Sequence, residues 1–151
     1  MKEKYIPMYM TIAETVAKQS SAKRLQVGAI IVKEDRVISL GYNGMPAGWT
    51  NECEYTIQHS DDTTSLKTKP EVIHAEANAI LHAKEPLHGM TLYITMPPCA
   101  SCSGLIIQSG ISKIVFPAPT EDQLDRWGPS MSRARRMLEE AGVEIKQIDK
   151  V

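Results

Sequence analysis

Four side chains in two short stretches of this sequence have the types and the spacing of a metal-dependent hydrolytic site. His74 and Glu76 belong to the stretch His-Ala-Glu, and Cys99 and Cys102 belong to the stretch Pro-Cys-Ala-Ser-Cys. Zinc in a hydrolytic site takes three protein ligands and keeps a fourth position for water. We therefore expect His74, Cys99 and Cys102 to hold one zinc ion, and we expect Glu76 to be the catalytic acid–base residue.

Each stretch lies at a predicted helix start, which favours this chemistry. Cys99 and Cys102 are three residues apart and therefore share a helix face. The positive end of a helix favours the thiolates that bind metal. Bound zinc acidifies water, which becomes a nucleophile near neutral pH. Glu76, in the first turn beside His74, would accept a proton from that water and pass it to a ring nitrogen and a leaving amine.

Two other interpretations of the Cys-x-x-Cys stretch stay open at this point. The two cysteines could be a redox pair, or they could belong to a structural zinc site with Cys53 or His82 as the fourth ligand. In the structural case the protein would be a zinc-stabilised binding module without turnover. The linked His-Ala-Glu stretch favours the hydrolytic site over both.

Length and composition limit the class of protein. The 151 residues fit a single domain over 1–151, and a hydrophobic content of 42% with 23% charged residues is ordinary for a globular protein. The net charge of −1 and the sequence pI of about 6.4 argue against a broad nucleic-acid-binding surface. No apolar run approaches the roughly 20 residues of a membrane span. Three cysteines are too few for a disulfide scaffold. We expect a cytoplasmic protein without a nucleic-acid or membrane partner.

Hydrophobic periodicity and turn residues predict strands and helices in alternation. Helices are expected at 7–19, 73–83, 99–109 and 129–141, and strands at 26–33, 36–42, 91–95, 113–116 and 143–148. The segments 41–48, 49–70 and 117–128 are expected to be loops, and 49–70 is a long insertion loop. The repeated order strand, helix, strand favours parallel pairing.

The order of these motifs resembles the deoxycytidylate (dCMP) deaminases, of the allosteric type found in phages and eukaryotes, within the cytidine deaminase-like superfamily. The pairing of H-x-E with P-C-x-x-C is the known signature of zinc-dependent nucleobase deaminases. The resemblance rests on the segments 26–31, 41–48, 73–80, 97–102 and 105–111 and extends over about 7–148. It implies an α/β protein with a three-layer α/β/α cytidine deaminase-like fold, in which helices cover both faces of a central five-stranded mixed sheet.

The same resemblance implies a reaction and substrate contacts. The expected reaction is the hydrolytic deamination of dCMP to dUMP and ammonia, which supplies dUMP for dTMP synthesis. Asn43 and the backbone of Ala75 would contact the substrate, although Asn43 could instead hold a turn with positive φ. Arg24 is the first candidate for the phosphate contact and Arg126 the second. Another small cytosine or adenine substrate, or a tRNA adenosine, is the alternative within the superfamily.

Metal content, effectors and assembly also follow from the resemblance. Some phage members hold a second, structural zinc through an extra Cys near the end of the first helix. The segment 18–24 has no Cys, so we expect one zinc per chain and a loop-packing role for Cys53. The loop 41–48 resembles the segment that binds dCTP as activator and dTTP as inhibitor, together with Mg²⁺. The residues expected to bind the effector nucleotide are Gly41, Tyr42, Asn43, Gly44, Met45, Pro46 and Gly48. A homo-oligomer, commonly a hexamer, is also expected.

Overall fold

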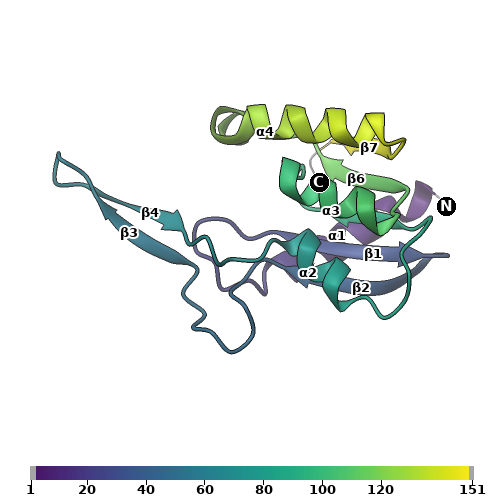
Figure 1. Ribbon diagram of the computed structural model, residues 1–151, viewed down its shortest axis with the longest axis horizontal. Coiled ribbons are helices and arrows are strands. Elements are labelled where there is room, and N and C mark those ends of the chain that lie inside the picture. The colour runs from purple at the N-terminus through teal and green to yellow at the C-terminus, as the bar shows by residue number, and fades with distance from the viewer. Residues whose placement is uncertain (1–2, 150–151) are drawn as a thin grey trace.

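The computed structural model describes residues 3–149 as one central sheet with helices on both faces and a separate two-stranded hairpin (Figure 1). A short 3₁₀ helix, Glu3–Tyr5, precedes the other elements. These are α1 (Ile6–Ala17), β1 (Gly28–Lys33), β2 (Arg36–Tyr42), β3 (Glu54–Gln58), β4 (Thr64–Thr68), α2 (Ala75–His82), β5 (Thr91–Ile94), α3 (Ala100–Ser109), β6 (Lys113–Pro117), α4 (Glu121–Glu140) and β7 (Glu144–Ile148).

The central sheet has five strands in the order β2-β1-β5-β6-β7. β1 runs antiparallel to both β2 and β5, whereas β5, β6 and β7 run parallel to one another. The predicted five-stranded mixed sheet is therefore confirmed. The expectation of parallel pairing holds only for β5, β6 and β7. The chain passes from β2 to β5 through α2, but β1 lies between these two strands, so they do not pair with each other.

The two faces of the sheet carry two hydrophobic clusters. α1 packs on one face, and α2, α3 and α4 lie on the other (Figure 1). Strand residues alternate between the clusters, as the period of two along a β-strand requires. The α1 side contains Tyr9, Met10, Ile30, Tyr93 and Val115, and the opposite side contains Ile31, Ala79, Leu92, Ile106, Ile114 and Leu138. The two hydrophobic clusters hold the helices on both faces of the sheet, and the predicted three-layer α/β/α arrangement is confirmed.

The insertion 49–70 contains a β-hairpin, so its prediction as a loop is wrong. β3 and β4 pair antiparallel, with Tyr55 opposite Lys67 and Thr56 opposite Leu66. The hairpin extends away from the central sheet (Figure 1). Because neither of its faces packs on the core, exposed polar and apolar residues mix along both strands, and the alternation that marks a half-buried strand is missing from the sequence.

Helix α4 begins at Glu121, so the prediction of a loop over 117–128 is wrong beyond Thr120. Thr120 Oγ1 accepts a hydrogen bond from Gln123 N, and Gln123 Oε1 accepts one from Thr120 N, each at 3.1 Å. This capping box starts the helix. Pro129, which suggested a later start, lies inside the helix and removes one N–H donor from the ladder. Within residues 3–149, no helix combines the length and the apolar character needed to cross a bilayer.

Gly41 brings β2 into close contact with α2. A Cβ atom at this position would overlap the backbone of Ala75 and Ala79, whereas a Cβ at Gly44 would meet no atom within 4 Å. We expect Gly41→Ala to lower the free energy of unfolding by about 1–3 kcal/mol through overpacking. Gly44→Ala, the matched control, should change it by no more than about 0.5 kcal/mol. Chemical denaturation followed by circular dichroism measures both, and equal stability of the two variants would contradict the packing role.

Candidate metal centre and active site

Three side chains from two helix starts converge on one point. His74 Nδ1 lies 3.5 Å from Cys99 Sγ and 3.3 Å from Cys102 Sγ. All three ligand atoms lie within 4.8 Å of one another, and this is the group of potential metal ligands found within residues 3–149. Tetrahedral zinc, with Zn–S of about 2.3 Å and Zn–N of about 2.0 Å, separates sulfur and nitrogen ligands by about 3.5 Å. The cluster therefore fits zinc.

Helix capping positions these ligands. His74 is the N-cap residue of α2, with extended backbone angles, and Cys99 is the N-cap residue of α3. Cys99 Sγ accepts a hydrogen bond from the backbone N of Cys102 at 3.4 Å, which turns both sulfur atoms toward the same side. The two helix N-termini direct their partial positive charges at the cluster and favour anionic sulfur there.

The protonation states of the cysteines are coupled in the absence of metal. The hydrogen bond from the Cys102 thiol, with a further one from His74, holds the pKa of Cys99 below its ordinary value. The same hydrogen bond to Cys99 raises the pKa of Cys102. Because a metal ligand must be deprotonated, zinc binding to these residues would release thiol protons.

Glu76 lies in the first turn of α2 with only 4% of its surface exposed. Burial is the main cause that raises the pKa of its carboxyl group above the ordinary value. A carboxyl group with a raised pKa, next to a cavity, both accepts and returns protons near neutral pH. Glu76 thus has the properties of a general acid–base residue.

A cavity of about 220 Å³ lies beside the cluster of potential metal ligands, His74, Cys99 and Cys102. Its floor includes His74, Ala75, Glu76 and Cys99. The remaining lining residues come from the segments before β1 and α2, the residue after β2, the end of the hairpin, the segment after β5, and α4: Arg24, Leu25, Val27, Asn43, Thr68, Val72, Met96, Pro97, Trp127, Ser130 and Met131. The cavity is the space in which a small molecule would meet both Glu76 and the metal.

The structure brings Asn43 and Arg24 to this cavity but leaves Arg126 outside it. Arg126 is absent from the lining and forms an ion pair with Asp122 at 3.1 Å, one turn earlier in α4. Its neighbour Trp127 lines the cavity instead. The second candidate for a phosphate contact therefore lies outside the cavity lining, where it pairs with Asp122 on the same helix.

Asn43 holds the segment that precedes β1. Its Oδ1 accepts a hydrogen bond from Val27 N at 2.9 Å, and its Nδ2 donates one to Leu25 O at 2.8 Å. Among the described non-glycine residues, only Glu34, Asp35 and Asp62 have positive φ, so the alternative of a positive-φ turn at Asn43 is wrong. The buried amide lines the cavity and sets its wall at the same time.

The proposed fourth ligands of a structural zinc lie apart from the cluster. Cys53 is buried in the loop that precedes β3, and its Sγ donates to Asn51 O at 3.7 Å. The ring of His82 contacts Asn78 O, one turn back in α2. Cys99 and Cys102 are free thiols rather than a disulfide. The cluster of three ligands beside a cavity therefore matches an open hydrolytic site better than a closed structural one.

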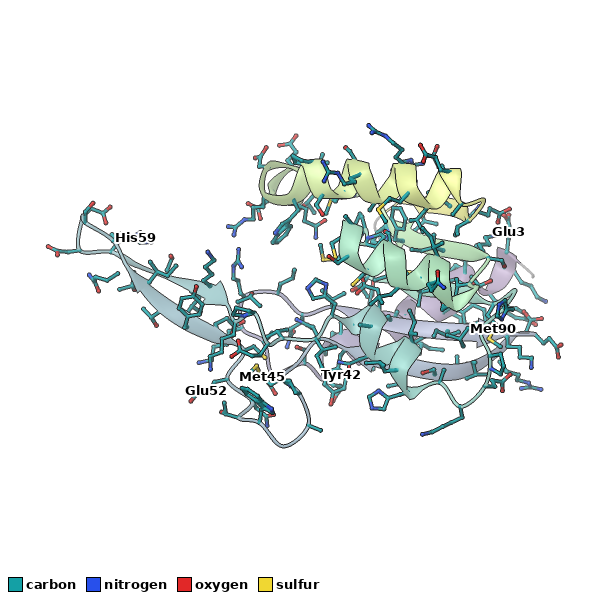
Figure 2. The ribbon with its side chains drawn as sticks, viewed as in Figure 1. Glu3, Tyr42, Met45, Glu52, His59 and Met90 are labelled. Atoms are coloured by element: carbon teal, nitrogen blue, oxygen red, sulfur yellow. The ribbon has the colours of Figure 1, made fainter. Side chains whose placement is uncertain are left out.

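The loop 41–48 combines packing positions with exposed ones. Gly41 is buried against α2, and Gly44 forms an isolated bridge with Ile73. Tyr42 is 40% exposed, and Gly48 has φ of 87°. In Figure 2, Met45 lies near the base of the hairpin, whereas Tyr42 lies beside α2, where its carbonyl oxygen accepts a hydrogen bond from Asn78 Nδ2 at 2.8 Å. Gly41 is thus explained by packing, whereas Tyr42, Ala47 and Gly48 are the exposed residues of the loop.

Sequence reasoning missed Thr68, Trp127 and Ser130 as cavity residues. Thr68 belongs to the insertion and Trp127 to the segment 117–128, which were both expected to be loops. Their only sequence signals were a polar side chain and a tryptophan among polar residues. Neither signal indicates a site without the fold, because the elements that carry them are far apart along the chain.

Comparisons with known proteins agree with this geometry. Residues 4–118 match the sequence model of the cytidine and deoxycytidylate deaminase zinc-binding region. An uncharacterized deaminase from the luxG 3′ region of Aliivibrio fischeri is 40% identical over 96% of this chain and 94% of its own. The deoxycytidylate deaminase of Mycobacterium phage D29 is 41% identical over 72% of this chain and 91% of its own.

The structure of a relative is similar as well. The crystal structure of dCMP deaminase from the cyanophage S-TIM5, in complex with dCMP and dUMP, has a TM-score of 0.77 and 32% identity. The match covers 98% of this chain and 99% of that one. Because the family match includes the helix starts that carry all three ligands and Glu76, this chain belongs to the zinc-dependent cytidine and deoxycytidylate deaminase family.

Proposed function

We propose that this protein hydrolyses dCMP to dUMP and ammonia. The observation that carries the proposal is a buried Glu76 beside the cluster of His74, Cys99 and Cys102, in a cavity that also contains Arg24. The names of the phage relatives and the dCMP and dUMP bound in the cyanophage enzyme support this substrate.

The residues of the cavity account for the proton transfers. Zinc held by the cluster would supply the Lewis acid that acidifies a water molecule. Glu76 takes one proton from that water while the water oxygen bonds to C4 of the cytosine ring. Glu76 then delivers this proton to N3 of the ring. Glu76 then takes the second proton and gives it to the departing amine, so that the C4–N bond breaks and ammonia leaves. Glu76 is recovered in its starting state.

Arg24 supports a nucleotide rather than a nucleoside as substrate. It is the one cationic side chain among the described residues that line the cavity. A guanidinium group binds phosphate oxygens through paired N–H donors. The opposite end of the substrate would then lie at Glu76 and the metal cluster.

Asn43 and Ala75 provide the remaining contacts in this proposal. The Asn43 amide makes one hydrogen bond through each of Oδ1 and Nδ2, which leaves one donor and one acceptor site for the substrate sugar or base. Ala75 is the first residue of α2, where the backbone N–H has no partner within the helix. A pyrimidine oxygen is a suitable acceptor for it.

Regulation and assembly form a further part of the proposal. We place a nucleotide effector site on the exposed part of the loop 42–48, with dCTP as activator, dTTP as inhibitor and Mg²⁺ on the triphosphate. The loop contains Asn43, so a ligand bound to its exposed residues would act on a cavity wall. Exposed apolar residues on β2 and α2 support a homo-oligomer, expected to be a hexamer: Leu40, Tyr42 and Leu81. The product dUMP would supply dTMP synthesis.

A deamination panel tests the substrate. The zinc-loaded protein should deaminate dCMP with a higher kcat/KM than deoxycytidine, CMP or dCTP, measured by the loss of cytosine absorbance and by ammonia release. Glu76→Gln should keep the fold and the zinc but lower kcat by about 10²–10⁴-fold, because the amide cannot carry a proton. A Glu76→Gln variant with normal turnover would remove Glu76 from its role, and a better rate with CMP or deoxycytidine would change the substrate.

Elemental analysis tests the metal site. We expect one zinc per chain, lost in Cys99→Ala and in Cys102→Ala, because either change leaves only two ligands. Cys53→Ala is the matched control and should keep its zinc, since this buried thiol lies in a separate loop. Two zinc ions per chain, or loss of metal from Cys53→Ala, would contradict a single three-ligand site.

Saturation curves for dCMP test the control by nucleotides. With Mg²⁺ present, dCTP should lower and dTTP should raise the dCMP concentration needed for half-saturation, by a coupling free energy of about 1–3 kcal/mol. Sedimentation of the same samples reports the assembly state. Superimposed curves under all three conditions would show that the loop is a turn without a ligand, and a fully active monomer would exclude the expected hexamer.

A further inference from the structure

Three elements that are distant in sequence hold Arg24 at the cavity. Glu54 Oε2, at the start of β3, accepts hydrogen bonds from Lys23 N at 2.8 Å and Arg24 N at 2.9 Å. Thr68 Oγ1, at the end of β4, accepts a hydrogen bond from Arg24 Nη1 at 3.3 Å. The Arg24 guanidinium carbon lies over the Trp127 ring, 5.9 Å from its centroid. Backbone and side chain of Arg24 are therefore held separately.

The base of the β3–β4 hairpin is attached to the cavity through these contacts. Glu54 and Thr68 lie opposite each other in the hairpin register, so one residue pair holds both the backbone and the guanidinium group of Arg24. The distal part of the hairpin projects into solvent, where His59 is labelled in Figure 2. A lone two-stranded hairpin buries too little surface to be stable by itself, so its attached base is the part that the fold specifies.

Trp127 supplies the third contact from the amino-terminal half of α4. Buried residues of this helix begin only at Met131, so the first half is held by its capping box rather than by the core. Trp127 nevertheless lines the cavity, together with Thr68 and Arg24. An aromatic face beneath a guanidinium group attracts it and fixes its plane.

The contacts fix the position of the Arg24 guanidinium group but use few of its N–H donors. A guanidinium group has five N–H donors, and Thr68 accepts from one of them. Glu54 takes backbone N–H groups instead of pairing with the guanidinium charge. Within residues 3–149 no carboxylate forms an ion pair with this guanidinium group, and its positive charge suits an incoming anion.

We propose that Thr68 and Trp127 are positioning residues that act through Arg24, so that the insertion and the start of α4 make this site selective for a 5′-phosphorylated nucleoside. The inference rests on the proposed function and deepens it. The insertion then affects substrate choice through Thr68 at the attached end of the hairpin, while the part of the hairpin that projects into solvent has no effect.

The test compares dCMP with deoxycytidine, and the product dUMP with deoxyuridine. Arg24→Ala should lower kcat/KM for dCMP by about 10–100-fold, the usual range for hydrogen bonds to a charged group, and leave deoxycytidine unaffected. Trp127→Ala should lower it by about 2–5-fold, as expected for an exposed cation–π contact, and Trp127→Phe should restore most of the loss. Thr68→Val should lower it by about 2–10-fold.

These losses should appear in KM rather than kcat, and calorimetric binding of dUMP should weaken by the same factors while deoxyuridine binding does not change. In an Arg24→Ala background, Trp127→Ala and Thr68→Val should have no further effect, because they act through the missing guanidinium group. Matched controls are Trp49→Ala, a tryptophan that is 56% exposed, and Thr64→Val at the other end of β4, and both should behave as wild type.

Different outcomes separate this inference from the proposed function. If wild type neither deaminates dCMP nor binds dUMP, the proposed function fails. If Arg24→Ala loses dCMP selectivity while Trp127→Ala and Thr68→Val keep it, the proposed function stands and the positioning roles are wrong. Equal losses for dCMP and deoxycytidine in Trp127→Ala and Thr68→Val would show a merely structural role and would also overturn the inference.

Discussion

The meeting of two helix N-termini at one point is the constraint on which the rest of the structure depends. His74 is the N-cap residue of α2 and Cys99 is the N-cap residue of α3, and their ligand atoms lie 3.5 Å apart. Metal coordination tolerates deviations of only about 0.2 Å, so the starts of both helices must be set by the sheet beneath them. In the central sheet, β2 is the last strand before α2, and β5 directly precedes α3. Only β1 lies between β2 and β5, so the starts of the two helices lie one strand apart.

The same convergence makes a buried carboxyl group tolerable. Glu76 is almost completely buried, and burial raises the pKa of its carboxyl group. An isolated buried charge is unfavourable, but the first turn of a helix presents unpaired N–H groups and a positive partial charge. The close packing of Gly41 against α2 fixes this turn against the sheet. Catalytic residues often have a perturbed pKa and lie in a cavity, as Glu76 does.

The rigid centre and the rim of the cavity are built differently. The metal cluster rests on helices that pack on the sheet, where the buried residues of the larger cluster gather. The rim consists of Arg24, the base of the hairpin and the first half of α4, which are held by hydrogen bonds and one ring contact rather than by a core. Such a division keeps the reacting groups in place while it lets substrate selectivity depend on peripheral segments.

The sequence by itself predicted the cluster of three potential metal ligands, the place of Glu76 in the first turn of α2, the five strands of the central sheet and four helices. These depend on local patterns: motif spacing at helix starts and hydrophobic periodicity. It did not reveal the β3–β4 hairpin, whose strands lack a buried face, or the early start of α4 at Glu121, directly after the Thr120 N-cap and eight residues before Pro129. Only the tertiary structure decided that Trp127 rather than Arg126 lines the cavity and that Thr68 contacts Arg24. These contacts join segments more than forty residues apart, and no local pattern specifies which side chains meet across such distances.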